Sequence, residues 1–134
     1  MLTLLHNMFI KAHARSEAAL RFAERLQREQ EAPRLRQRVP SLATLRLEIT
    51  DGRGATNADP KHVRIIVVDT APALFSLTCG DHGCRDGGHD LTSDVLRGLL
   101  ARAAHFEVAD ACLGTVGAAE CGRTMRVEVS ATYR

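Results

Sequence analysis

The positions of the cysteines constrain this chain more than any other feature of its sequence. All four lie in the second half of the 134 residues and form two pairs, Cys79 with Cys84 and Cys112 with Cys121. Each pair stands at the end of an apolar run, and a segment with the pattern of a helix separates the pairs. Zinc is bound tetrahedrally by thiolates that converge from separate segments of a chain. The sequence therefore predicts that all of these cysteines meet at one Zn²⁺ site.

The residues around the cysteines favour metal ligands over buried core side chains. Cys84 and Cys121 stand in polar stretches that contain glycine, where a core side chain is not expected. The Cys79-Gly80 and Cys121-Gly122 steps resemble the cysteine-glycine step of zinc knuckles, and the whole arrangement resembles small zinc-ribbon proteins in general. It departs from their pattern in one respect, because eight residues separate the second pair instead of about two to four.

Other interpretations of the cysteine region stay open. His82 or His89 can replace one cysteine as a ligand, or the cysteines bind no metal and pack as small hydrophobes. Catalysis at an open zinc site, using Cys84, His89 and Asp90, is a weaker alternative. The chain lacks both the His-x-Glu and Pro-Cys-x-x-Cys motifs of zinc deaminases and the His-Glu-x-x-His motif of metalloproteases, so we expect no enzyme. A thiol or zinc redox sensor is a further alternative, although neither pair has Cys-x-x-Cys spacing.

Hydrophobic periodicity predicts the secondary structure. Apolar residues recur at three- and four-residue steps over residues 2–31, which predicts a long amphipathic helix that ends before Pro33. From Leu42 the period changes to two, which is typical of half-buried strands. We predict strands near residues 42–50, 63–68, 75–79, 106–112 and 125–133, the second of them an interior strand, and a helix over 91–104 with Asp90 or Thr92 as its N-cap.

This order of elements predicts an α+β fold. We expect a long N-terminal helix followed by a mostly antiparallel sheet, with one packed helix and a zinc-ribbon-like four-cysteine site. Residues 1–40 are expected to form an amphipathic, basic helical arm and a linker, and residues 41–134 the zinc-binding domain. The linker from Pro33 to Pro40 carries alternating arginines between two prolines, and we expect it to be extended.

Basic residues are concentrated near the N-terminus. Residues 11–38 carry eight arginines or lysines against four glutamates, whereas the chain after residue 45 carries ten basic and twelve acidic residues. Arg34, Arg36 and Arg38 have no acidic neighbour in the sequence except Glu31, so they are the predicted phosphate contacts. Our first hypothesis is therefore a non-enzymatic zinc module that binds RNA or a nucleoprotein machine, such as the ribosome or the transcription apparatus, through this arm.

The apolar stripe of the same helix supports a different function. Phe9, Phe22 and Leu26 lie on that stripe and could dock on a partner protein or on a second copy of the chain. In this second hypothesis the zinc is purely structural.

The sequence also bears on where the protein acts. No stretch approaches the roughly 18 consecutive apolar residues of a membrane span. The opening segment lacks the basic start and the cleavage site of a signal peptide. We therefore expect a cytoplasmic protein that contacts no membrane. In a reducing compartment cysteines are more often metal ligands than disulfides.

Overall fold

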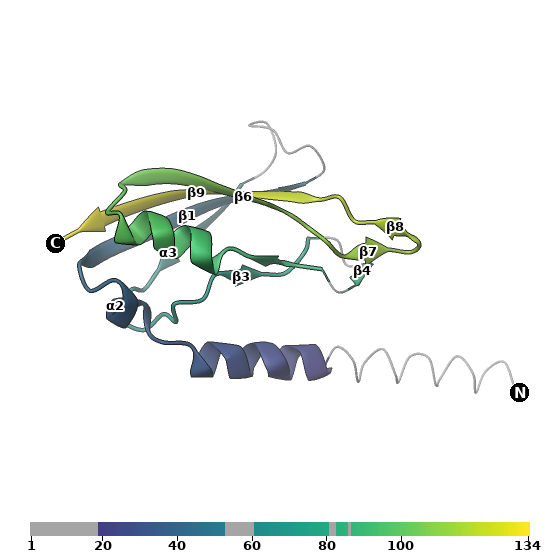
Figure 1. Ribbon diagram of the computed structural model, residues 1–134, viewed down its shortest axis with the longest axis horizontal. Helices are drawn as coiled ribbons and strands as arrows, with labels where there is room; N and C mark the ends of the chain where they lie inside the picture. Colours follow the sequence, from purple (N-terminus) through teal and green to yellow (C-terminus); the bar gives the residue numbers. More distant parts are fainter. Residues whose placement is uncertain (1–18, 53–60, 81–82, 86) are drawn as a thin grey trace, which may run out of the picture. The chain divides into compact units, whose positions relative to one another are not determined.

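The computed structural model describes residues 19–52, 61–80, 83–85 and 87–134, and the chain divides into two compact units, Met1–Ala32 and Pro33–Arg134 (Figure 1). The first unit is helical over residues 19–31, in agreement with the predicted helix. The remainder of that predicted helix, including Phe9, lies outside the described residues. Leu20, Phe22 and Leu26 of this helix are 64%, 54% and 41% exposed. In the described residues no helix is both long enough and apolar enough to cross a membrane.

The second unit is built on one antiparallel sheet, which we call the main sheet. Its strand order is β2-β1-β9-β6, and every neighbouring pair of strands is antiparallel. The bounds of the elements of this unit are α2 Leu35–Arg38, β1 Leu42–Gly52, β2 Lys61–Ile66, β3 Ser76–Leu77, β4 Cys84–Arg85, β5 His89–Asp90, α3 Thr92–Leu100, β6 His105–Ala111, β7 Thr115–Val116, β8 Ala119–Glu120 and β9 Thr124–Tyr133. The predicted α+β class with a mostly antiparallel sheet and one packed helix is confirmed.

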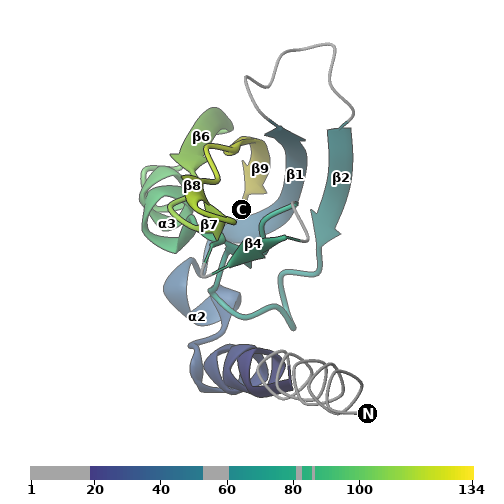
Figure 2. The ribbon, with the colours of Figure 1, turned by 90° about the vertical axis from the view of Figure 1, so that its right-hand side faces the viewer.

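The core lies between one face of the main sheet and α3. Alternate residues of β1 and β9 are buried, and the register places Leu47 opposite Val129 and Ile49 opposite Val127. Opposite residues of antiparallel strands project from the same face of the sheet, so these side chains form one apolar layer. Leu99 and the other buried residues of α3 belong to the same core cluster, and α3 lies beside β6 (Figure 2).

The expected extended linker is wrong over α2. Leu35–Arg38 form one helical turn, and Leu35 and Val39 are almost fully buried. These two apolar residues are four positions apart, so a helical turn places both on one face. The Leu35 N–H donates to the Ala71 carbonyl at 2.9 Å, which attaches this turn to the rest of the domain.

The run predicted as an interior strand is also placed differently. It forms β2, which is an edge strand, and Val63, Ile65 and Val67 of this run are 51%, 76% and 65% exposed. A β-branched run reflects a preference for extended backbone, and that preference is met at an edge as well as in the interior of a sheet.

The elements next to the cysteines are shorter than predicted. The strand expected over residues 75–79 is reduced to β3, which pairs with β5. Helix α3 ends at Leu100, and Arg102 then adopts a left-handed conformation with a φ of 57°. Leu91 is the N-cap residue of α3, while Asp90 accepts a hydrogen bond from the Thr92 N–H at 3.1 Å.

Candidate metal centre

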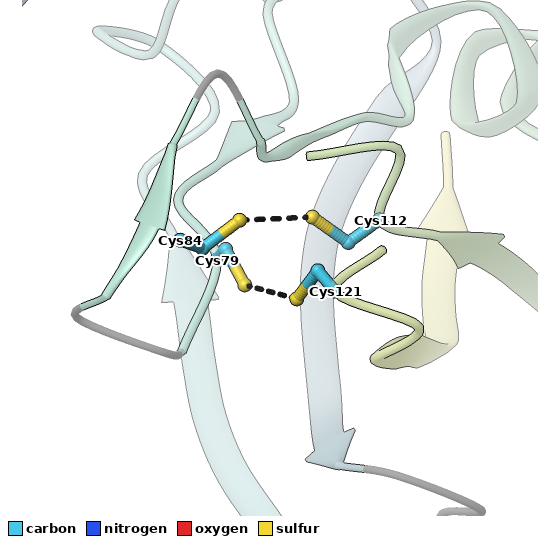
Figure 3. A group of neighbouring side chains, drawn as sticks. All are labelled: Cys79, Cys84, Cys112 and Cys121. Carbon is cyan, nitrogen blue, oxygen red and sulfur yellow. Dashed lines mark hydrogen bonds between the residues drawn. The ribbon is translucent and has the colours of Figure 1, made fainter. Parts of the chain in front are cut away.

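The cysteines are carried by short segments beyond the end of the main-sheet core. Cys79 follows β3, Cys84 opens β4, Cys112 follows β6 and Cys121 follows β8. Strands β4, β7 and β8 form a small antiparallel sheet, and β4 pairs with β7 so that Cys84 lies opposite Val116. This pairing brings the loop of the first cysteine pair against the hairpin between the second pair (Figure 3).

The four sulfur atoms form one cluster, which we call the cysteine cluster. It consists of Cys79, Cys84, Cys112 and Cys121, and all of its Sγ atoms lie within 4.8 Å of one another. Cys79 Sγ is 3.6 Å from Cys121 Sγ, and Cys84 Sγ is 3.6 Å from Cys112 Sγ. A tetrahedral zinc ion with Zn–S bonds of about 2.3 Å separates its sulfurs by about 3.8 Å. All the cysteines are free, so the predicted meeting of the two pairs at a site that can hold a metal ion such as zinc is confirmed.

The two close sulfur contacts cross between the pairs. Cys79 contacts Cys121 and Cys84 contacts Cys112, so each contact joins the first loop to the second (Figure 3). Cys112 and Cys121 are buried, while Cys79 and Cys84 are half-buried. An ion at the centre would therefore link two segments that are otherwise joined by strands of only two residues.

Backbone N–H groups are directed at the buried sulfur of Cys112. Burial by itself raises the pKa of this thiol, but hydrogen bonds from the N–H groups of Gly114 and Gly88, together with the Cys84 and Cys79 thiols, outweigh it and lower the pKa to about 7. In Cys84, burial and the hydrogen bonds among the clustered thiols raise the pKa to about 12. Cys112 is thus ionised more readily than Cys84, and the thiolate is the form that binds metals.

Gly87 approaches two of the sulfurs so closely that it leaves no room for a side chain. A Cβ atom on Gly87 would lie 2.5 Å from Cys112 Sγ and would also overlap Cys84 Sγ. The sequence pointed to the glycines next to the cysteines, such as Gly80 and Gly122, and did not predict a role for Gly87. Its only signal was the Gly87-Gly88 step between Cys84 and the helix.

An ion pair supports the turn at Cys79. Arg123 Nε lies 3.3 Å from Asp51 Oδ1, and both side chains are mostly buried. A Cβ atom on Gly80 would overlap the Asp51 carboxylate, so the Cys79-Gly80 turn lies directly against this pair. Because Arg123 follows Cys121 by two residues, the ion pair joins the end of β1 to the segment that carries Cys121.

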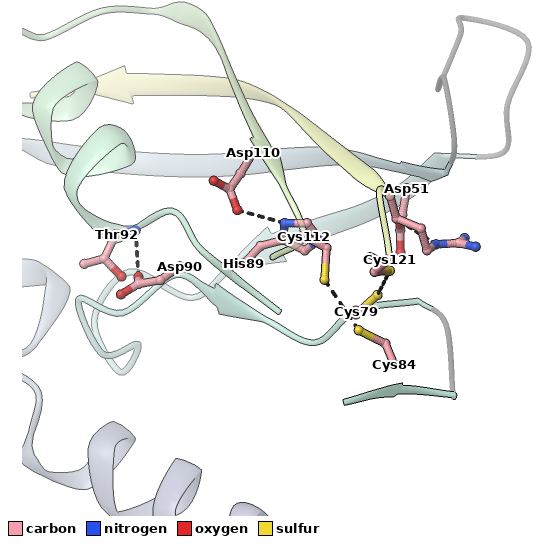
Figure 4. A network of polar contacts seen from close by, with 10 residues as sticks. Asp51, Cys79, Cys84, His89, Asp90, Thr92, Asp110, Cys112 and Cys121 are labelled. Carbon is pink, nitrogen blue, oxygen red and sulfur yellow. Dashed lines mark hydrogen bonds and ion pairs between the residues drawn. The ribbon is translucent and has the colours of Figure 1, made fainter. Parts of the chain in front are cut away.

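His89 lies beside the cysteine cluster but is not part of it. Its side chain is fully buried, and its Nδ1 is hydrogen-bonded to Asp110 Oδ2 at 2.9 Å (Figure 4). Its Nε2 has no hydrogen-bond partner in the described part of the chain. The hydrogen bond between His89 and Asp110 joins β5 to the end of β6. Gly88 directly precedes β5, and Cys112 directly follows β6. His82, the other histidine considered as a ligand, lies outside the described residues.

Two of the three arginines predicted to contact phosphate have partners that the sequence did not reveal. Arg36 pairs with Asp69 at 2.7 Å and also donates to the Pro40 carbonyl. Arg34 donates to the Thr70 carbonyl at 3.1 Å. Arg38 makes no side-chain hydrogen bond or ion pair with any residue that the structure describes. The basic segment therefore contributes to the attachment of α2, whatever else it binds.

The candidate metal centre is defined by the residues of this chain alone. Its donor set is sulfur only, the four sulfurs lie within 4.8 Å of one another, and a glycine and two backbone N–H groups border them. A comparison of the chain with protein-family models, with curated proteins and with solved structures finds no match.

Proposed function

We propose that this protein is a non-enzymatic zinc-binding module in which the metal is structural. The thiolates of the cysteine cluster would hold the ion. The observation that carries the proposal is the meeting of four Sγ atoms within 4.8 Å of one another. Thiolate ligands select zinc over magnesium, calcium and manganese, which prefer oxygen.

The composition of the donor set supports a structural role. A catalytic zinc ion keeps a coordination position open for water, whereas structural sites fill the tetrahedron with protein ligands. In the cysteine cluster every position of a tetrahedron would be taken by a sulfur. Asp90, the carboxylate considered as a catalytic base, hydrogen-bonds the start of α3.

The shortness of the surrounding strands also supports this role. Strands β3, β4, β5, β7 and β8 contain two residues each. Hairpins this small are not stable in water without further support. A metal ion that links residues 79 and 84 to residues 112 and 121 would supply that support.

The first test measures the metal content of protein purified without added metal, together with its free thiols. We expect about one zinc per chain and thiols that become reactive only after chelation. Replacing the exposed Leu113 by serine provides the control, because it changes the neighbour of Cys112 and leaves the cysteine cluster intact. A metal-free protein with four freely reactive thiols would contradict the proposal and favour the redox alternative.

A second function is favoured by the exposure of the apolar stripe on the N-terminal helix. Phe22 and Leu26 lie on this stripe, and these large apolar side chains remain 54% and 41% exposed. We propose that this stripe docks on a second copy of the chain. The partners of Arg34 and Arg36 make phosphate binding through these arginines the less supported alternative.

Sedimentation and RNA-binding measurements distinguish self-association through the helix from RNA binding through the arginines. We expect a dimer that persists at high salt and dissociates when Phe22 is replaced by aspartate, because the charge would be buried in the interface. Arg38→Glu is the matched variant for the RNA hypothesis, since Arg38 has no described partner to lose. A monomer that binds single-stranded RNA, with an affinity that falls with added salt and with Arg38→Glu, would reverse our preference.

A further inference from the structure

The main sheet ends at β2 with an edge that the described residues do not cover. Within the residues that the structure describes, β2 pairs only with β1, and it lies at the margin of the sheet (Figure 2). The outer edge of such a strand presents unpaired N–H and C=O groups, which form a template for another strand. Natural proteins often protect such edges from pairing with their own copies by charged side chains, and β2 carries Lys61 and Arg64.

The outward face of β2 carries aliphatic side chains. Val63 and Ile65 are 51% and 76% exposed, and they lie opposite Glu48 and Arg46 of β1. Glu48 and Arg46 form an ion pair of 2.6 Å, and further ion pairs on this face join Lys61 to Glu48 and Glu128, and Arg126 to Glu107. The aliphatic side chains therefore project from an otherwise charged face, directly at its open edge.

The other face of β2 carries the basic side chains His62 and Arg64. His62 and Arg64 lie opposite Ile49 and Leu47, which are buried in the core, yet His62 and Arg64 themselves are exposed. Neither of them forms an ion pair with a residue in the described ranges. Among the described residues, the strand thus offers aliphatic contacts on one face, the guanidinium of Arg64 and the imidazole of His62 on the other, and an unpaired backbone edge between them.

We propose that β2 binds an extended segment of another protein, in which acidic residues alternate with aliphatic ones, by adding it as a strand to the main sheet. The backbone of the segment would pair with the open edge of β2. Its acidic side chains would lie beside Arg64 and His62, and its aliphatic side chains beside Val63 and Ile65. A second copy of this chain is a poorer occupant, because β2 contains basic and no acidic residues, so two copies would bring like charges together.

The experiment uses the whole 134-residue chain as purified and synthetic peptides of alternating residues. The probe is a peptide of alternating glutamate and valine, and the controls are a lysine-valine peptide and a glutamate-valine peptide with alternate backbone nitrogens methylated. Binding is measured by fluorescence anisotropy, and the contact surface is mapped by amide chemical shifts. We expect only the unmethylated glutamate peptide to bind, with the largest shifts in Lys61–Ile66.

Substitutions of exposed residues test the two faces separately. Arg64→Glu is expected to weaken binding of the glutamate peptide about tenfold and to strengthen binding of the lysine peptide. Opposite charges on neighbouring strands stabilise the pairing, whereas like charges destabilise it. Ile65→Lys is expected to weaken binding by a similar factor through loss of the aliphatic contact. Leu100→Lys, at a residue of α3 that is 57% exposed, is the control and should leave binding unchanged.

Several results would overturn the proposal. The first is equal binding of the glutamate and lysine peptides, and the second is undiminished binding of the methylated peptide. The third is a set of peptide-induced chemical shift changes that are largest outside β2. Concentration-dependent self-association that is lost in Ile65→Lys would assign the edge to a second copy instead. None of these measurements depends on the identity of the metal, so the proposed zinc site is tested independently.

Discussion

Removing zinc from the purified protein is expected to unfold the segments that carry the cysteines and to leave the main sheet folded. The binding of structural zinc contributes about 10–16 kcal/mol of apparent free energy in zinc-finger peptides. The segments around the cysteine cluster have strands of two residues and cannot replace that contribution. The main sheet has its own apolar core, which includes Leu45, Val129 and Leu99.

Hydrogen exchange before and after chelation measures this difference directly. We expect protection to disappear between β3 and α3 and between β6 and β9, and to persist in β1 and β9. Cys112→Ser should reproduce the chelated state with a zinc affinity more than about a hundredfold lower, since losing a ligand exceeds the loss of an outer-shell partner. Leu113→Ser, next to it in sequence and 92% exposed, should behave as the unmodified protein. Unfolding of the whole domain on chelation would contradict the expectation that the main sheet stays folded without the metal.

Gly87→Ala is expected to disable the metal centre through one added methyl group. The new Cβ would lie 2.5 Å from Cys112 Sγ, and it would also overlap Cys84 Sγ. Either the sulfurs or the glycine backbone must then move, and the backbone of Gly88 also donates to Cys112 Sγ. We expect zinc affinity to fall by at least about a hundredfold, because two ligands are displaced from the tetrahedron at once.

Gly52→Ala is the matched control for this prediction. A Cβ at Gly52 would meet no atom within 4 Å among the described residues, so this variant should bind zinc normally. Its stability should be unchanged or slightly higher, because alanine reduces the entropy of the unfolded chain. A competition assay against a chromophoric chelator measures both affinities. Equal affinities in the two variants would show that the cysteine cluster rearranges around Gly87 without loss.

The sequence by itself determined the strands in which apolar and polar residues alternate, because this local pattern shows which face is buried. The alternation of Leu45, Leu47 and Ile49, and that of Met125, Val127 and Val129, predicted two strands with one buried face, and both are in the main sheet. The clustering of the cysteines was also predictable, because a cysteine in a polar, glycine-rich segment is not expected to be a core residue and is more often a metal ligand. These inferences need only neighbours along the chain.

Tertiary structure decided the features that depend on residues far apart in sequence. The crossing of Cys79 to Cys121 and Cys84 to Cys112 follows from the pairing of β4 with β7, which no local pattern encodes. Asp69 as the partner of Arg36 lies 33 residues away. The edge position of β2 depends on which strands flank it, whereas a run of β-branched residues reports only an extended backbone. Periodicity describes one segment at a time, so contacts between segments, and the metal centre that they assemble, become visible only in the folded chain.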